Sequence, residues 1–226
     1  TDANLAGISY EAEDLESLET HCTIVKPQMG VWPKNAPDKV EEFTVRFQKG
    51  LAVKINGKQV MPLKAMQEAN KIAGRNGIGI KNALENRMIG TKSRGVYEAP
   101  GMELLGHCLR VVYQATMNKQ CADLFRSLSN LVAANVYAAR YFDPSTRAAM
   151  AAMETMAEHA SGTVKVGLYR GNIFFHSLAD CPASLYNQAD SSMEESSGLN
   201  PKSSQGYAEI QSVEAKALAR AGQIRP

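Results

Sequence analysis

The chain has 226 residues, of which 44% are hydrophobic and 21% are charged, as in ordinary globular proteins. A chain of this length buries well over half of its unfolded surface, so one large domain or two small ones can form a hydrophobic core. The formal net charge of +2, from 25 basic and 23 acidic residues, gives no sign of a nucleic-acid or membrane partner.

The N-terminal segment carries few regular signals. Leu15 and Leu18 indicate a short helix. Residues that break helices follow it: Pro27, Gly30, Pro33 and Pro37. We therefore expect this segment to run over the surface as a connection.

Alternation of apolar and polar residues begins at Phe43 and predicts antiparallel strands. Phe43, Val45 and Phe47 share one face of the first strand. A second strand runs through residues 51–55 to Asn56-Gly57, a strong hairpin signal. Proline and glycine then bound a predicted helix over residues 62–73, whose apolar positions are Leu63, Met66, Ala69 and Ile72.

The segment Glu85 to Gly101, ENRMIGTKSRGVYEAPG, concentrates charge, glycine and one aromatic residue. Glu85 is an acid that can bind an ammonium group, and Tyr97 can close over a polar ligand. Three cations lie between them and can bind a carboxylate: Arg87, Lys92 and Arg94. This mixture suits a zwitterionic ligand. A charged surface loop that ends at Pro100 is the plainer interpretation.

Three helices are expected next, over residues 102–115, from a cap at Asn118 to about residue 136, and from a cap at Asp143 to about residue 162. The second carries a continuous apolar stripe, and the methionines of the third favour core or subunit packing. Alternation returns at residues 164–168 and 173–175 around an Arg170-Gly171-Asn172 turn and predicts a second hairpin.

Glycine and serine are frequent from residue 191 to residue 205, and a helix is predicted over residues 207–221. This helix has few large apolar residues, so burial against its own chain cannot hold it. It either docks on another subunit or frays as a tail.

The cysteines give no metal or disulfide signature. Cys22, Cys108, Cys121 and Cys181 are never in CxxC spacing, and no histidine falls beside them in a ligand pattern. We expect no metal site and reduced, mostly buried thiols in a cytoplasmic protein. No apolar run reaches membrane-spanning length, and no signal-like segment starts the chain.

The region from Gly77 to Gly101 closely resembles the argininosuccinate synthase family, which carries the pattern GxGxxxxxENRxxGxKSRGxYExPG. The resemblance continues in TDANLAGISYEAEDLE, in EEFTVRFQKGLAVKINGK and in SLYNQ, and GMELL after the tyrosine is similar to bacterial members. IKNA at Ile80 to Ala83 departs from the charged residues common there.

The pattern and the resemblance together predict an α+β fold: antiparallel hairpins packed with a layer of helices, and an extended C-terminal helix. We expect residues 1–40 to be a connecting segment from a missing ATP-binding domain, residues 41–190 a synthetase domain, and residues 191–226 a linker and oligomerisation helix. The family's pyrophosphate loop, SGGxDS, is absent from the sequence. We therefore read the chain as part of a longer enzyme and expect it to be inactive alone.

The resemblance implies an ATP-dependent ligation of citrulline and aspartate to argininosuccinate, with Mg²⁺ accompanying the nucleotide. Ser9, Glu85 and Tyr97 match citrulline-binding positions, and a further family serine would fall just before Thr1. No residue is assigned as catalytic, because this chemistry needs no protein nucleophile. The family also implies a homotetramer held together by the C-terminal helix.

Two other classes of function remain open from the residues alone. One is a non-catalytic oligomerisation module. The other is an anion or nucleic-acid binder that uses the three cations of the motif. Cations interleaved with Glu85 and Glu98 are poorly arranged to bind a phosphate backbone. Aromatic residues make up only 7% of the chain, so few side chains are available for nucleobases to stack on.

Overall fold

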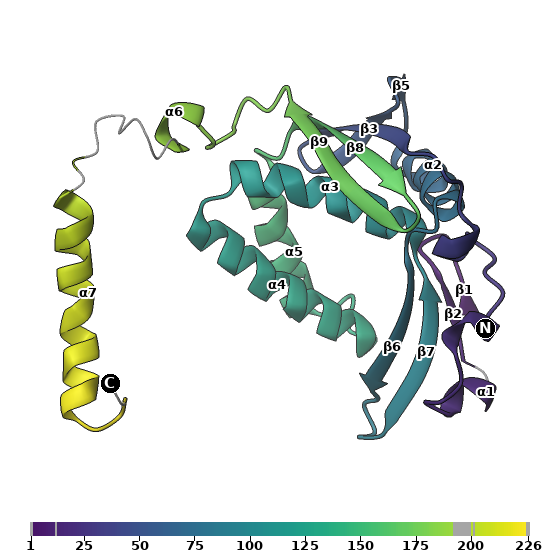
Figure 1. Ribbon diagram of the computed structural model, residues 1–226, viewed down its shortest axis with the longest axis horizontal. Helices are drawn as coiled ribbons and strands as arrows, with labels where there is room; N and C mark the ends of the chain where they lie inside the picture. The colour runs from purple at the N-terminus through teal and green to yellow at the C-terminus, as the bar shows by residue number, and fades with distance from the viewer. Residues whose placement is uncertain (1, 12, 192–199, 201, 225–226) are drawn as a thin grey trace. The chain divides into compact units, whose positions relative to one another are not determined.

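The computed structural model describes residues 2–11, 13–191, 200 and 202–224 and has an α+β architecture (Figure 1). The chain divides into two compact units, residues 1–185 and residues 186–226. The first unit contains two antiparallel sheets and a set of helices. The second contains two helices.

The larger sheet has the strand order β5-β4-β3-β8-β9, and all its pairs are antiparallel. Its strands are β3 (Glu41–Gln48), β4 (Leu51–Ile55), β5 (Lys58–Gln59), β8 (Gly162–Tyr169) and β9 (Asn172–Ala179). Both predicted hairpins are present. Asn56-Gly57 and Arg170-Gly171 have positive φ at both residues, as two-residue hairpin turns require.

Helices α2 (Pro62–Arg75) and α3 (Pro100–Thr116) pack against each other and against this sheet. The side chains of Phe43, Val45 and Phe47 are buried in the resulting core, as their alternation predicts. The predicted core face of α2 is partly wrong, because Leu63 is 62% exposed. Ala69 and Ile72 are buried as predicted, and Ala65 and Ala73 are buried as well. The small side chains of the alanines allow the helices to approach closely.

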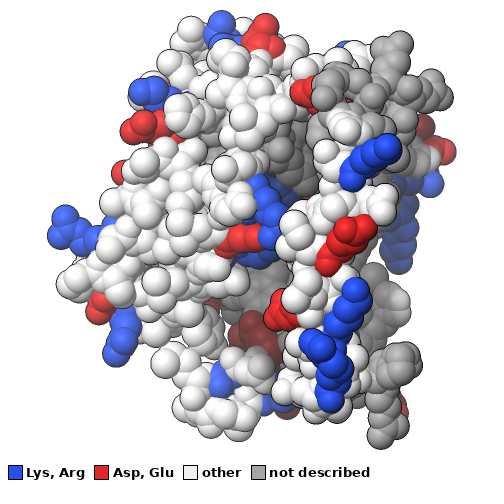
Figure 2. All heavy atoms as spheres, turned by 90° about the vertical axis from the view of Figure 1, so that its left-hand side faces the viewer, with Lys and Arg blue, Asp and Glu red and all other residues white. Residues whose placement is uncertain are grey.

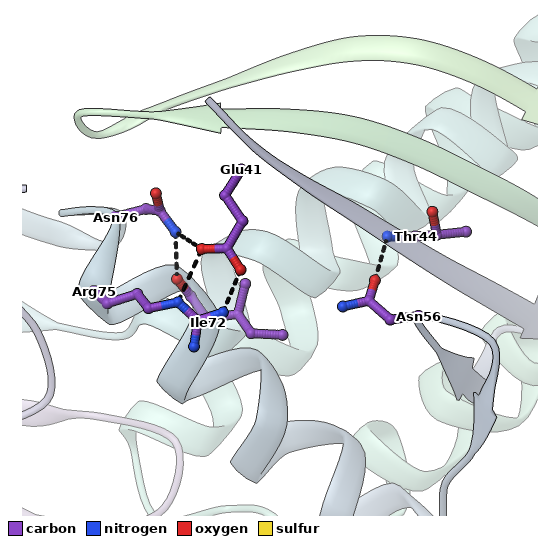
Figure 3. Close-up of polar contacts among 6 residues, drawn as sticks. All are labelled: Glu41, Thr44, Asn56, Ile72, Arg75 and Asn76. Atoms are coloured by element: carbon purple, nitrogen blue, oxygen red, sulfur yellow. Dashed lines mark hydrogen bonds and ion pairs between the residues drawn. The ribbon is translucent and has the colours of Figure 1, made fainter. Parts of the chain in front are cut away.

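The carboxylate of Glu41 joins β3 to the end of α2 (Figure 3). It accepts hydrogen bonds from Arg75 Nε at 2.8 Å and from Asn76 Nδ2 at 2.7 Å. Figure 3 also shows the side chain of Asn56 accepting from the backbone N–H of Thr44, which fixes the turn to the neighbouring strand. The contacts of Glu41 set the position of α2, which leads directly into the second sheet.

Helices α4 (Lys119–Tyr137) and α5 (Pro144–Ala157) form a further antiparallel pair. The predicted caps are confirmed: Asn118 Oδ1 accepts from the N–H of Cys121, and Asp143 Oδ1 accepts from that of Ser145. Helix α5 ends before the predicted residue 162. No residue of α4, which is described over its whole length, is fully buried. Part of the apolar stripe of this helix, namely Leu124, Leu131 and Val136, is exposed within the first unit.

The smaller sheet has the order β1-β2-β7-β6 and was not expected from the sequence. Its strands are β1 (Asp2–Ala3), β2 (Ile8–Tyr10), β7 (Lys92–Glu98) and β6 (Ile80–Asn86). Short helices follow β2: α1 (Glu13–Glu16), η1 (Cys22–Ile24) and η2 (Pro33–Asn35). The N-terminal segment does not simply run over the surface, because Ile8, Tyr10 and Leu15 form a second core with Val25 and Val96.

The second unit contains α6 (Gln188–Ser191) and α7 (Lys202–Arg220). The predicted terminal helix is confirmed but starts earlier, at Lys202. Most of the glycine- and serine-rich stretch lies outside the described residues. Tyr207, Ile210 and Val213 are 66%, 70% and 64% exposed within the described part of the chain.

The thiols differ from expectation. All four cysteines are free, but only Cys108 is buried, whereas Cys22, Cys121 and Cys181 are half-buried. Burial raises the pKa of Cys108 to about 12, so this thiol is inert near neutral pH. Within the described residues, none of the helices combines the length and the apolar character needed to cross a bilayer.

Candidate substrate-binding site

The motif from Glu85 to Gly101 forms a β-hairpin followed by the start of α3, not a surface loop. Strand β7 is central: it pairs with β6 on one side and with β2 on the other. The register places Ser9 opposite Tyr97 and Glu85 opposite Ser93. Segments far apart in the sequence thus bring the three predicted site residues together.

The three residues line one open cleft of about 710 Å³. Its other lining residues are Glu11, Arg87, Met88, Ile89, Ser93 and Tyr137. Tyr137 comes from the last turn of α4, which approaches the β6–β7 hairpin in Figure 1. The cleft therefore has a polar floor on the sheet and apolar groups at the hairpin tip and on α4.

Glu85 and Tyr97 are directly linked. The Tyr97 hydroxyl donates to Glu85 Oε1, and Ser93 Oγ donates to the same oxygen at 3.4 Å. Burial, followed by the hydrogen bond to Glu85 and its charge, raises the pKa of Tyr97. The phenol therefore stays protonated and can act as a donor. The carboxylate has further lone pairs for a ligand cation.

The cations of the motif are distributed over different faces, because side chains alternate along a strand. Arg87 lines the cleft and pairs with Glu11 at 3.2 Å. Arg94 turns to the opposite face, where its guanidinium donates to the carbonyl oxygens of Leu15, Ser17 and Thr20. Arg94 thus holds the N-terminal segment in place and does not reach the cleft.

A second cleft of about 780 Å³ lies next to the first. It is lined by Glu11, Glu16, Leu18, Leu84, Arg87, Lys92, Ser93 and Arg94. Both signs of charge are present there. On the side of the molecule that Figure 2 draws, Lys and Arg also lie beside Asp and Glu, and wide areas carry neither. The cations that line the second cleft alternate with Glu11 and Glu16, unlike a continuous basic track that binds a nucleic-acid backbone.

Glu98, which sequence reasoning placed only among the motif's charges, is a buried structural residue with 1% exposure. Its carboxylate accepts hydrogen bonds from the Tyr10 hydroxyl at 2.5 Å, from Gln28 N at 2.7 Å and from Met29 N at 2.9 Å. Burial, together with the hydrogen bond to Glu98, raises the pKa of Tyr10 to about 12. This network fixes the face of the sheet opposite the cleft.

The sequence analysis assigned no binding role to Glu11, Ser93 or Tyr137. Ser93 was open to inference, since it lies at an even spacing from Tyr97 and so shares its face of a strand. Tyr137 carried no local signal, because only the packing of α4 brings it to the hairpin.

The arrangement suits a small ligand with an ammonium group. Glu85 provides the charge, and the hydroxyls of Ser9, Ser93 and Tyr97 provide donors and acceptors around it. A family model described as Arginosuccinate synthase C-terminal domain matches residues 1–218. The chain belongs to the argininosuccinate synthase family.

Proteins named argininosuccinate synthase from three bacteria illustrate how similar this member is to others. The chain is 39% identical to the protein of Rhodopirellula baltica over 221 residues, which are 97% of this chain and 54% of that protein. It is 34% identical to the Campylobacter curvus protein, covering 94% of this chain and 52% of that protein. For the protein of a Thermoanaerobacter species, the identity is 35%, with 91% of this chain and 50% of that protein covered. The chain spans about half the length of these curated relatives.

Proposed function

We propose that this chain is the substrate-binding half of an argininosuccinate synthase, which acts in arginine biosynthesis and ligates citrulline and aspartate with ATP. The observation that carries the proposal is the meeting of Ser9, Glu85 and Tyr97 in one cleft of a chain that belongs to this family. Glu85 is the partner of the citrulline ammonium group. Ser9 and Tyr97 form hydrogen bonds with the same substrate.

The role of these residues is to hold citrulline, not to react with it. In the proposed reaction, the ureido oxygen of citrulline attacks the α-phosphate of ATP and pyrophosphate leaves. The amine of aspartate then displaces AMP. Positioning and charge stabilisation supply the rate enhancement, so no nucleophilic side chain is required.

ATP and Mg²⁺ are assigned to the remaining part of a longer protein. The sequence contains no SGGxDS loop, and the described residues contain no group of three or more His, Cys, Asp or Glu that could hold a metal ion. We expect the chain alone to release no pyrophosphate from ATP. A citrulline- and aspartate-dependent release by this chain alone would contradict that expectation.

We also propose a homotetramer in the cytoplasm, with α7 as the docking element. The exposed apolar side chains of Tyr207, Ile210 and Val213 support this part of the proposal. A role purely in oligomerisation is the competing function, and it predicts no dependence on the cleft residues.

Glu85→Gln tests the assignment of the cleft, because it keeps the size of the side chain and removes its charge. Removing one partner of a desolvated ion pair costs roughly 2 to 5 kcal/mol, so citrulline affinity or turnover of the full-length protein should fall by about thirtyfold to several thousandfold. The measurements are a citrulline titration and steady-state kinetics, with the melting temperature as a check of folding.

Glu154→Gln is the matched control, since Glu154 is an exposed side chain on α5. It makes the same chemical change away from the cleft and should leave citrulline dependence unaltered. Near-wild-type citrulline dependence of a folded Glu85→Gln protein would reject the site and favour the oligomerisation module.

A further inference from the structure

The ring of Tyr97 lies along its own strand, over the backbone of Gly95. Glu85 faces Ser93 across the hairpin, whereas Tyr97 faces Lys81. Positions 93 and 97 are separated by about 13 Å of strand, at about 3.3 Å per residue. The phenol and the carboxylate meet only because both side chains lean toward each other along the strands.

The position between them is occupied by the pair Gly95 and Ala83, which lie on the same face. A Cβ built on Gly95 would lie 2.8 Å from both Cε2 and the hydroxyl of Tyr97. That distance is well inside van der Waals contact. The φ of Gly95 is not positive, so its backbone conformation is one that any residue can adopt. The requirement for glycine here is one of space.

We infer that Gly95 is a positioning residue: because it lacks a side chain, the Tyr97 ring can lie across it and its hydroxyl can reach Glu85. The consequence of this arrangement is that citrulline binds to a pair of Tyr97 and Glu85 that is already assembled. This consequence rests on the proposed function. Gly95 is thus proposed to act on citrulline binding indirectly, through the ring of Tyr97 that lies over it.

Gly95→Ala is the direct test, and its first measurement needs no ligand. The three atoms nearest to the added methyl group all belong to the end of the Tyr97 side chain, which can rotate away, so this chain should still fold. The displaced phenol loses its hydrogen bond to Glu85 and some burial, which are causes of its raised pKa. NMR titration of isotope-labelled tyrosine, with Tyr97 assigned from Tyr97→Phe, should show its midpoint falling toward the ordinary 10.0.

The second measurement is citrulline affinity in the full-length protein. Loss of one hydrogen bond to a charged group corresponds to a loss of affinity of roughly ten- to a hundredfold. Gly95→Ala and Tyr97→Phe should each cause a loss of this order. The double variant should be no weaker than Tyr97→Phe alone, since both changes remove the same interaction.

Gly167→Ala is the matched control, because a Cβ there would lie 2.7 Å from His176 on a strand of the other sheet. It crowds a side chain to the same degree and should change neither the Tyr97 titration nor citrulline binding. If Gly95→Ala unfolds the chain, adding Tyr97→Ala must restore the melting temperature, and failure to do so overturns the inference.

The inference is also overturned if the folded Gly95→Ala protein has the same titration midpoint for Tyr97 as the wild type. It is overturned as well if Gly95→Ala shifts this midpoint but leaves citrulline binding unchanged, while Glu85→Gln weakens citrulline binding. A different conclusion follows if Gly95→Ala shifts the titration midpoint of Tyr97 while Glu85→Gln binds citrulline normally. This outcome supports the placement of Tyr97 by Gly95 and rejects the proposed substrate.

Discussion

Arg87 and Arg94 belong to one cationic run in the sequence, but the strands give them different roles. Arg87 lies at the end of the hairpin, pairs with Glu11 and is 48% exposed. The guanidinium of Arg94 is half-buried and donates to three backbone carbonyls and to Asn82 Oδ1. The sequence alone cannot separate the two, because their roles depend on which segment covers each face of the sheet.

Arg94→Lys should therefore lower the stability of the fold. Lysine has no planar fork, so it cannot reach carbonyls at several different positions. Buried groups that lose their partners cost roughly 1 to 3 kcal/mol. Thermal or urea unfolding of this chain measures the change. Arg87→Lys is the control and should alter stability by less than about 1 kcal/mol, because exposed ion pairs contribute little. Equal effects of the two substitutions would contradict the structural role of Arg94.

At the level of elements, the sequence predicts what is encoded locally. The turns at Asn56-Gly57 and Arg170-Gly171 and the caps at Asn118 and Asp143 depend on neighbouring residues, and the hairpins and helices around them are found. The smaller sheet is different. β2 is three residues long and pairs with β7 far along the chain. β2 alternates but is too short to give a signal, and β7 is rich in charge and lacks the apolar alternation that predicts a strand.

The candidate site also combines features that the sequence predicts with features that depend on long-range contacts. Ser9, Glu85 and Tyr97 were found through a long sequence pattern, and residue chemistry alone equally allowed a charged surface loop. Their meeting depends on the pairing of β2 with β7, and Tyr137 depends on the packing of α4. Such contacts are set by tertiary structure, which outweighs local preference.

The bond between Tyr10 and Glu98 joins β2 to β7 and to the segment at Gln28, and it predicts a pH dependence of stability. The pKa of Tyr10 rises from its ordinary 10.0 to about 12 on folding. The unfolded chain therefore loses this proton first as pH increases. The contribution of the Tyr10–Glu98 hydrogen bond to the free energy of unfolding is fully present below pH 10 and is lost as the pH approaches 12.

Tyr10→Phe should remove this component, because phenylalanine has no ionisable proton. The variant should be less stable near neutral pH and show a flatter loss of stability between pH 10 and pH 12. Urea unfolding at several pH values measures both effects. Tyr141→Phe, at a position 48% exposed, is the control and should retain the wild-type slope. A Tyr10→Phe protein with the same alkaline slope as wild type would show that another group is responsible.

At the scale of the whole molecule, α7 is described over its whole length and has no buried residue. A single helix of its length is marginal in water, and helices in proteins gain most of their stability from packing of an apolar face. Tyr207, Ile210 and Val213 are spaced so that they lie on one side of α7, and all three are exposed. A second copy of the chain can cover these side chains, in agreement with the tetramer proposed above.

Ile210→Lys should therefore reduce the number of subunits, because a charge placed in an apolar interface loses its hydration without gaining a partner. Removal of all residues from Tyr207 onward should have the same effect. Light scattering on the intact and altered proteins at equal concentration gives the subunit number. Ala208→Lys adds the same charge at an exposed position on the opposite side of α7 from the apolar stripe, and it should leave the assembly intact. If Ile210→Lys and the truncated protein both keep the wild-type number of subunits, α7 is not the docking element, and assembly has to use another surface, such as the exposed apolar face of α4.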